Sequence, residues 1–135
     1  NIENIWDKIQ DIDTLREICK PKASFIACDD SPIQWKEGKT FVFKMYLHGF
    51  LPVGRHTINV VKMDKTSREI DTKEYDNTVV IWNHYIKMEE ISQQVTRYTD
   101  TVDLYAGCLT SITAWWTLKF YKHRQRKWQK IAKSL

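Results

Sequence analysis

Two ionisable residues, His84 and Asp100, interrupt an otherwise apolar pattern in two long predicted strands at residues 79–89 and 94–105. Side chains alternate between the faces of a strand, and both residues fall on the mostly apolar face that should point inward. If the turn between the strands centres on residues 91–93, His84 lies directly opposite Asp100, with Cβ atoms roughly 4.5–5.5 Å apart. Because a buried charge is costly unless it is paired, we expect an imidazolium–carboxylate pair on the inner face.

Three interpretations of this pair stay open. It is a structural ion pair beside Tyr98, since ion-pair networks also occur in protein cores. Alternatively, it is the polar anchor of a largely apolar cavity, which is the usual design of a small-ligand site. In a third, catalytic interpretation, His84 acts as a general base oriented by Asp100, and Tyr98 is the acid or oxyanion donor of a cyclase- or hydratase-type enzyme.

The other residues capable of chemistry form no recognisable site. His48 falls on the polar side of its strand and is expected to be exposed, and His56 stands at the start of a strand. No two histidines are spaced as ligands on one element, so no metal is expected. Cys108 precedes the last helix, and a buried inert thiol is expected there in preference to a reactive one. With four glycines and no nucleotide-binding or hydrolase fingerprint, the chain is also expected to need no cofactor.

The C-terminal segment is strongly basic. Residues 119–133 hold seven Lys or Arg residues and His123, and no acidic residue follows Asp103. Cations near a helix C-terminus complement its dipole and normally face water. A role in binding an anionic partner through this end is a further hypothesis, but nucleic acid is not expected because no known binding motif accompanies the charge. His123 or Arg124 is placed to reach a ligand's polar head from the inner side of the helix.

Apolar periodicity predicts the elements that must position these residues. One helix is expected near residues 2–9, and a second begins at Asp11 or Asp13 and ends before Pro21. A turn is expected at residues 29–32 and a loop at 49–54. A long helix should span residues 109–134, with its inward stripe formed by Ile112, Trp115, Trp116, Phe120, Lys127 or Trp128, Ile131 and Leu135. Strands are expected at residues 22–28, 39–48, 55–63, 68–75, 79–89 and 94–105.

This order of elements predicts an α+β fold in which the long helix forms a second layer on an antiparallel sheet. The length of 135 residues is that of one domain, so residues 1–135 are expected to form a single unit. No stretch is long and apolar enough to cross a membrane. Three cysteines, without a C-x-x-C spacing, argue against a disulfide framework and favour a cytoplasmic location.

Several short motifs, in this order, resemble the START-like or SRPBCC superfamily, particularly its uncharacterised bacterial members. They are Ile5-Trp6-Asp7, Trp35-x-x-Gly38, Trp82-x-His84, the run Thr96 to Val102, and the run Phe120 to Trp128. The resemblance implies a helix-grip fold, in which a curved antiparallel sheet wraps a long C-terminal helix around a hydrophobic cavity. Members of the superfamily begin with a strand before the first helix, and upstream residues carrying that strand are expected to be missing from this sequence.

The resemblance also implies binding of a small hydrophobic or amphipathic molecule, such as a lipid or a polyketide, although some members of the superfamily are enzymes. Fold alone does not fix function, so this implication is an analogy. The side chains expected to line the cavity are Phe41, Phe43, Met45, Trp82, His84, Tyr98, Asp100, Val102, Trp116 and Phe120.

Overall fold

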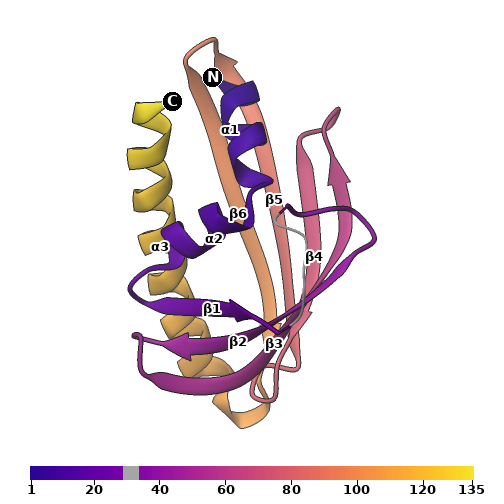
Figure 1. The fold of residues 1–135 in the computed structure, drawn as a ribbon, viewed down its shortest axis with the longest axis vertical. Helices are drawn as coiled ribbons and strands as arrows, with labels where there is room; N and C mark the ends of the chain where they lie inside the picture. Colours follow the sequence, from indigo (N-terminus) through magenta and orange to yellow (C-terminus); the bar gives the residue numbers. More distant parts are fainter. Residues whose placement is uncertain (29–33) are drawn as a thin grey trace.

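The computed structural model describes residues 1–28 and 34–135, so the turn predicted at residues 29–32 lies outside the described residues. It has the expected α+β architecture, consistent with a helix-grip fold: a six-stranded antiparallel sheet with its strands in chain order, a long C-terminal helix beside it and two short N-terminal helices (Figure 1). The strands are β1 (Ala23–Ala27), β2 (Thr40–Leu47), β3 (Leu51–Asp64), β4 (Glu69–Tyr75), β5 (Ile81–Ser92) and β6 (Val95–Tyr105).

The two N-terminal helices begin where side chains cap them. α1 (Ile2–Ile9) follows Asn1, whose side chain accepts a hydrogen bond from the backbone N–H of Asn4 at 3.1 Å. α2 (Ile12–Cys19) is capped in the same way by Asp11. Such caps satisfy backbone donors that have no partner within the helix. Both helices turn their apolar residues toward the sheet, which closes one side of the interior.

The inner face of the sheet carries the alternating residues of β2 and β5, as predicted. Phe41, Phe43 and Met45 are buried on β2, and so are Trp82, His84, Ile86 and Met88 on β5. β3 is longer than predicted and begins at Leu51, inside the expected loop. The reason is a tight β2–β3 turn, in which His48 and Gly49 both adopt positive φ and reverse the chain within three residues.

The predicted register of β5 and β6 is wrong. The chain reverses at Gln93 and Gln94, so the turn lies between one and two residues later than a turn centred on 91–93, and Ile91 is an unpaired bulge residue. His84 therefore pairs with Val102, and Asp100 pairs with Ile86. The histidine and the aspartate are diagonal neighbours on the inner face instead of direct opposites.

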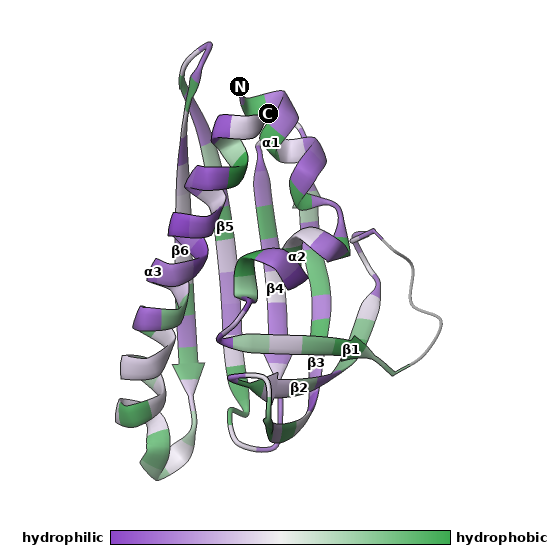
Figure 2. Cartoon of the chain, turned by 60° about the vertical axis from the view of Figure 1, so that its left-hand side comes forward, coloured by the Kyte–Doolittle hydropathy of each residue, from purple (hydrophilic) through white to green (hydrophobic). Residues whose placement is uncertain are grey.

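The C-terminal helix, α3, spans Thr110–Ser134 and follows a short 3₁₀ turn, η1 (Gly107–Leu109). The predicted apolar stripe is wrong at both ends of the helix. Ile112 and Trp115, in the first turns of α3, are 68% and 60% exposed, and Leu135 is also exposed. Trp115 points away from the interior because, at 3.6 residues per turn, it lies on the face of α3 opposite the buried Arg124. Figure 2 shows that the apolar residues of α3 gather in these first turns and the hydrophilic ones toward its C-terminus. The residues that α3 buries are Thr117, Phe120, Tyr121, Arg124, Trp128 and Ile131.

Among the described residues, no helix combines the length and the apolar character needed to span a bilayer.

Candidate functional site

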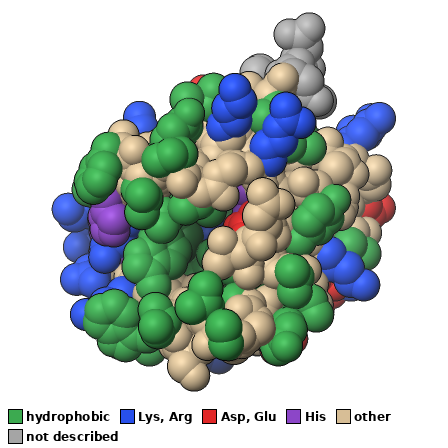
Figure 3. All heavy atoms as spheres, turned by 90° about the horizontal axis from the view of Figure 1, so that it is seen from below, with side chains coloured by type: hydrophobic (Ala, Val, Ile, Leu, Met, Phe, Trp, Pro, Cys, Tyr) green, Lys and Arg blue, Asp and Glu red, His purple; other side chains and the backbone are tan. Residues whose placement is uncertain are grey.

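A cavity of about 80 Å³ lies between the inner face of the sheet and α3. Side chains from all three α-helices and from strands β1 to β5 line it, and most of them are apolar. Seen from the end of the molecule where α3 begins, the surface is hollowed, and hydrophobic side chains surround the hollow (Figure 3). Although the cavity is largely apolar, its wall includes the buried or nearly buried polar side chains of Thr14, His56, Thr72, Glu74, His84 and Arg124.

His56 lies between two buried carboxylates. Its Nδ1 is 3.1 Å from Oδ2 of Asp76, and its Nε2 is 2.8 Å from Oε1 of Glu74. Burial by itself lowers the pKa of His56, but the hydrogen bonds and charges of Asp76 and Glu74 outweigh burial and raise this pKa to about 9. His56 is therefore an imidazolium at neutral pH, and both of its ring nitrogens donate.

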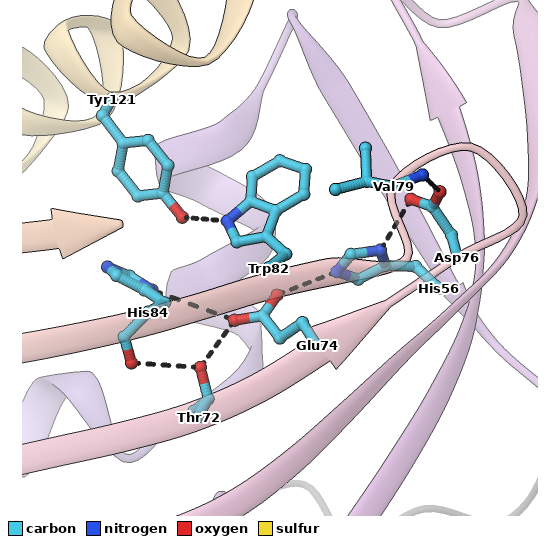
Figure 4. A network of polar contacts seen from close by, with 8 residues as sticks. All are labelled: His56, Thr72, Glu74, Asp76, Val79, Trp82, His84 and Tyr121. Carbon is cyan, nitrogen blue, oxygen red and sulfur yellow. Dashed lines mark hydrogen bonds and ion pairs between the residues drawn. The ribbon is translucent and has the colours of Figure 1, made fainter. Parts of the chain in front are cut away.

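The two carboxylates of this group are held by further donors. Asp76 Oδ1 accepts the backbone N–H groups of Thr78 and Val79 in the β4–β5 turn, and Glu74 Oε2 accepts the hydroxyl of Thr72 at 2.6 Å (Figure 4). Burial raises the pKa of both carboxyl groups, but the hydrogen bond to His56 and its charge more than reverse this, so both pKa values lie below the ordinary range. Both groups are therefore anionic at neutral pH.

His84 forms the second polar group. Its Nε2 is 2.7 Å from Oδ1 of Asp100, and both side chains are only 5% exposed. Burial raises the pKa of Asp100, and the hydrogen bond from His84 outweighs it, so this pKa is lowered overall. The second carboxylate oxygen accepts a hydrogen bond from Gln125 of α3 at 3.2 Å. His84 Nδ1 is 3.9 Å from Oε2 of Glu74, so this imidazole bridges the two polar groups.

α3 contributes an aromatic hydroxyl and a guanidinium to the same region. The hydroxyl of Tyr121 accepts a hydrogen bond from the indole N–H of Trp82 at 3.2 Å, and the Tyr121 ring stands edge-on to His84, with ring centres 4.9 Å apart. Figure 4 shows Tyr121, Trp82 and His84 converging from α3 and β5. Of the two residues that the sequence offered as reaching inward, Arg124 is the buried one. His123 instead meets the backbone carbonyl of Lys20 near the surface, at 2.6 Å.

The ten residues predicted to line the cavity do not all meet there. Met45, Trp82, His84, Trp116 and Phe120 line it. Phe41 and Phe43 lie deeper in the core and pack edge-on against Trp35, with ring centres 4.7 and 6.1 Å away. The three β6 residues line other hollows: Tyr98 faces one near the C-terminal end of α3, while Asp100 and Val102 border a groove between β6 and α3. These three residues are separated from the main cavity because α3 lies beside β6 and covers the inner face of that strand.

The sequence analysis missed the role of His56, Glu74 and Asp76. The signal was present, because His56, Ile58 and Val60 alternate on β3, as do Ile70, Thr72 and Glu74 on β4. A strand with charged residues at every second position looks like an exposed edge, and only the pairing of β3 with β4 brings these charges together.

The cysteines add no reactive group to the cavity. Cys19 is completely buried, and burial raises its pKa to about 12, so it is a neutral thiol. Cys108 is exposed, not buried as predicted, because η1 lies outside the core at the free end of α3. Within residues 1–28 and 34–135, no group of three or more His, Cys, Asp or Glu side chains is arranged to hold a metal ion.

Comparisons of the chain with known protein families, with curated proteins and with solved structures find no match. The candidate site is therefore interpreted from its own geometry.

Proposed function

We propose that this protein binds a small amphipathic molecule in the cavity between the sheet and α3. The observation that carries the proposal is a mostly apolar cavity whose wall includes several buried, charged side chains. Placing charges beside an empty apolar space costs free energy, and a few polar groups in an apolar pocket are what orient a bound small molecule. The earlier resemblance to START-like proteins supports the same function by analogy.

The size of the cavity limits the guest in this conformation. A space of about 80 Å³ holds several water molecules or a small organic group. A longer guest has to extend toward the hollowed end of the molecule, where the wall includes Trp116 and Phe120 of α3 (Figure 3). We place this function in the cytoplasm, since the three cysteines are free thiols.

The direct experiment is native mass spectrometry of the purified full chain, followed by organic extraction. We expect an adduct that is lost on denaturation and recovered in the extract. Ile86 lines the cavity, so Ile86→Phe should fill it and lower adduct occupancy at least tenfold. Ile81→Phe is the matched control, because Ile81 is an exposed residue of the same strand. An adduct equally abundant in both variants, or no adduct and no binding of any apolar probe, contradicts the proposal.

Catalysis by His84 is the second candidate, and the 2.7 Å contact with Asp100 favours it, because a carboxylate on one imidazole nitrogen orients the other as a base. Tyr98 is not placed to act with them, since it lines a different hollow. Tyr121 is a phenol on the cavity wall whose ring stands edge-on to that of His84. If a substrate is found, turnover that survives in His84→Gln excludes this role.

A further inference from the structure

Arg124 is a buried cation without a counter-ion in contact. The residue is 7% exposed, lies midway along α3 and lines the cavity. Within residues 1–28 and 34–135 its side chain makes no hydrogen bond and no ion pair, and its Nε is buried without an acceptor. An arginine has five N–H donors and stays protonated at any pH that a protein meets. A guanidinium in this position therefore carries unused donors and an unneutralised charge.

The surroundings of Arg124 compensate for only part of that charge. Its guanidinium carbon lies 4.8 Å from the centre of the Tyr121 ring and 5.8 Å from that of Phe120, so the aromatic faces supply cation–π attraction. The carboxylate whose charge acts on it is Asp100, and the two oxygens of Asp100 are already engaged by His84 and Gln125. Neither contact gives the guanidinium an acceptor of its own.

The other polar neighbours of Arg124 carry no charge at neutral pH. Burial raises the pKa of Cys19 to about 12, and it raises the pKa values of Tyr98 and Tyr121 above the ordinary value for a phenol. Glu74 also lines the cavity, but His56 and Thr72 occupy its oxygens. The guanidinium is thus the one cation of the cavity wall that no carboxylate contacts among the described residues.

The unsatisfied groups along the cavity wall are all donors. The guanidinium Nε of Arg124 is buried without an acceptor among the described residues. The indole of Trp128 lies against the Tyr98 ring, on the side of a different hollow. Tyr121 adds a hydroxyl that accepts from Trp82 and whose own proton has no acceptor in the described structure. A wall that presents spare donors and one spare positive charge is complementary to an acceptor with a negative charge.

We propose that Arg124 binds the carboxylate head of an amphipathic monoanion whose apolar body fills the cavity. This inference rests on the proposed function and specifies its ligand class. The planar guanidinium fork matches a carboxylate in two parallel hydrogen bonds. The hydroxyl of Tyr121 is a further donor available to the bound head. One guanidinium neutralises one negative charge. A carboxylate carries one negative charge, whereas a phosphate monoester carries close to two, so the carboxylate fits this small space better.

The experiment compares linear carboxylates of four to twelve carbons with the primary alcohols of the same length, using calorimetry and thermal shift on the delipidated full chain. We expect the best carboxylate to bind at least tenfold more tightly than its alcohol. Arg124→Met should weaken carboxylate binding at least tenfold and leave the alcohol within twofold, and Arg124→Lys should fall between. Arg126→Met is the matched control, because Arg126 is exposed on the same helix. Alkyl phosphates of the same lengths test the alternative anion.

The outcomes separate this inference from the proposed function. If alcohols bind but carboxylates have no advantage, or if the advantage persists in Arg124→Met, the carboxylate assignment is overturned and cavity binding stands. Alkyl phosphates binding more tightly than carboxylates also overturns the assignment. If neither series binds at any length, both proposals fail. Folding of Arg124→Met is checked by near-ultraviolet circular dichroism, and its melting temperature without ligand should equal or exceed that of the wild type, because an uncompensated buried charge is removed.

Discussion

His84 and Asp100 are diagonal neighbours on β5 and β6, and yet the imidazole Nε2 lies 2.7 Å from the carboxylate Oδ1. Diagonal positions across an antiparallel pair have Cα atoms roughly 7–8 Å apart, a gap that two side chains leaning toward each other can close. Gln125 of α3 holds the other oxygen of the carboxylate. The contact thus links the two strands to the helix at the wall of the cavity.

Replacing Asp100 by asparagine should destabilise the protein by about 1–3 kcal/mol at pH 7, because His84 loses its carboxylate while both stay buried. The hydrogen bond to His84 lowers the pKa of Asp100 against the effect of burial, so its contribution is present above the unfolded pKa of about 3.9 and is lost as the pH falls through the lower folded value. Urea titrations from pH 3 to 7 should show that the free energy of unfolding falls less steeply with decreasing pH for Asp100→Asn than for the wild type. Asp103→Asn, at an exposed position of β6, should leave this pH dependence of the free energy of unfolding unchanged.

A second pH dependence comes from His56 and has the opposite sign. Although burial lowers the pKa of His56, Asp76 and Glu74 raise it to about 9, above its unfolded value of about 6.5. The stabilisation is fully present below pH 6.5 and is lost as the pH rises toward 9, a change on the order of 3 kcal/mol.

Chemical denaturation at pH 6, 7, 8 and 9 measures this loss. His56→Gln cannot be protonated at this side chain. Its free energy of unfolding should be lower than that of the wild type at pH 6 and should fall less between pH 6 and 9. His48→Gln is the matched control, because His48 is exposed. A wild-type protein as stable at pH 9 as at pH 6 would contradict the ion-pair assignment for His56.

Much of the fold could be predicted because alternation and helical spacing are local signals. The faces of β2 and β5 follow from residues two apart, and they are correct although the β5–β6 register is not. Register depends on which residues turn, and the polar run around Gln93 fits several turns equally well. The start of α3 was predicted wrongly for another reason: Ile112 and Trp115 have core-like residue types, but Trp115 lies on the face of the helix opposite the buried Arg124.

The cavity could be predicted only in part, because its polar wall depends on which strands are neighbours. His56 meets Glu74 and Asp76 across the β3–β4 pair and through the β4–β5 turn, and nothing local marks the three as partners. Arg124 sits in a segment that otherwise carries exposed cations, so its composition indicated solvent exposure. Its helical position, seven residues before Ile131 and four after Phe120, places it on the buried stripe.

Two phenylalanines distinguish residues that build the core from residues that form the cavity wall. Phe41 does not line the cavity but packs behind Trp35, which does, while Phe120 lines the cavity itself. Each change to leucine removes buried ring surface and should cost about 1–2 kcal/mol of unfolding free energy. Only Phe120→Leu enlarges the cavity, so only that variant should change the affinity for a bound apolar probe by threefold or more. Calorimetry with the best-binding probe decides this, and equal affinity changes in the two variants would show that Phe120 does not contact the guest.

Two tryptophans of α3 test how the helix packs. Trp128 is buried against the Tyr98 ring, with ring centres 5.6 Å apart, so Trp128→Ala should cost about 3–5 kcal/mol through the cavity it leaves. Trp115 is mostly exposed, and the ammonium of Lys119 lies over its ring, 4.2 Å from the ring centre, so Trp115→Ala should cost at most about 1 kcal/mol. Urea denaturation followed by far-ultraviolet circular dichroism compares them, and Trp128→Phe gives a milder step if the alanine variant does not fold. Equal losses at both positions would mean that the first turns of α3 are covered in solution, which would reverse the assignment of Ile112 and Trp115 to an exposed end of the helix.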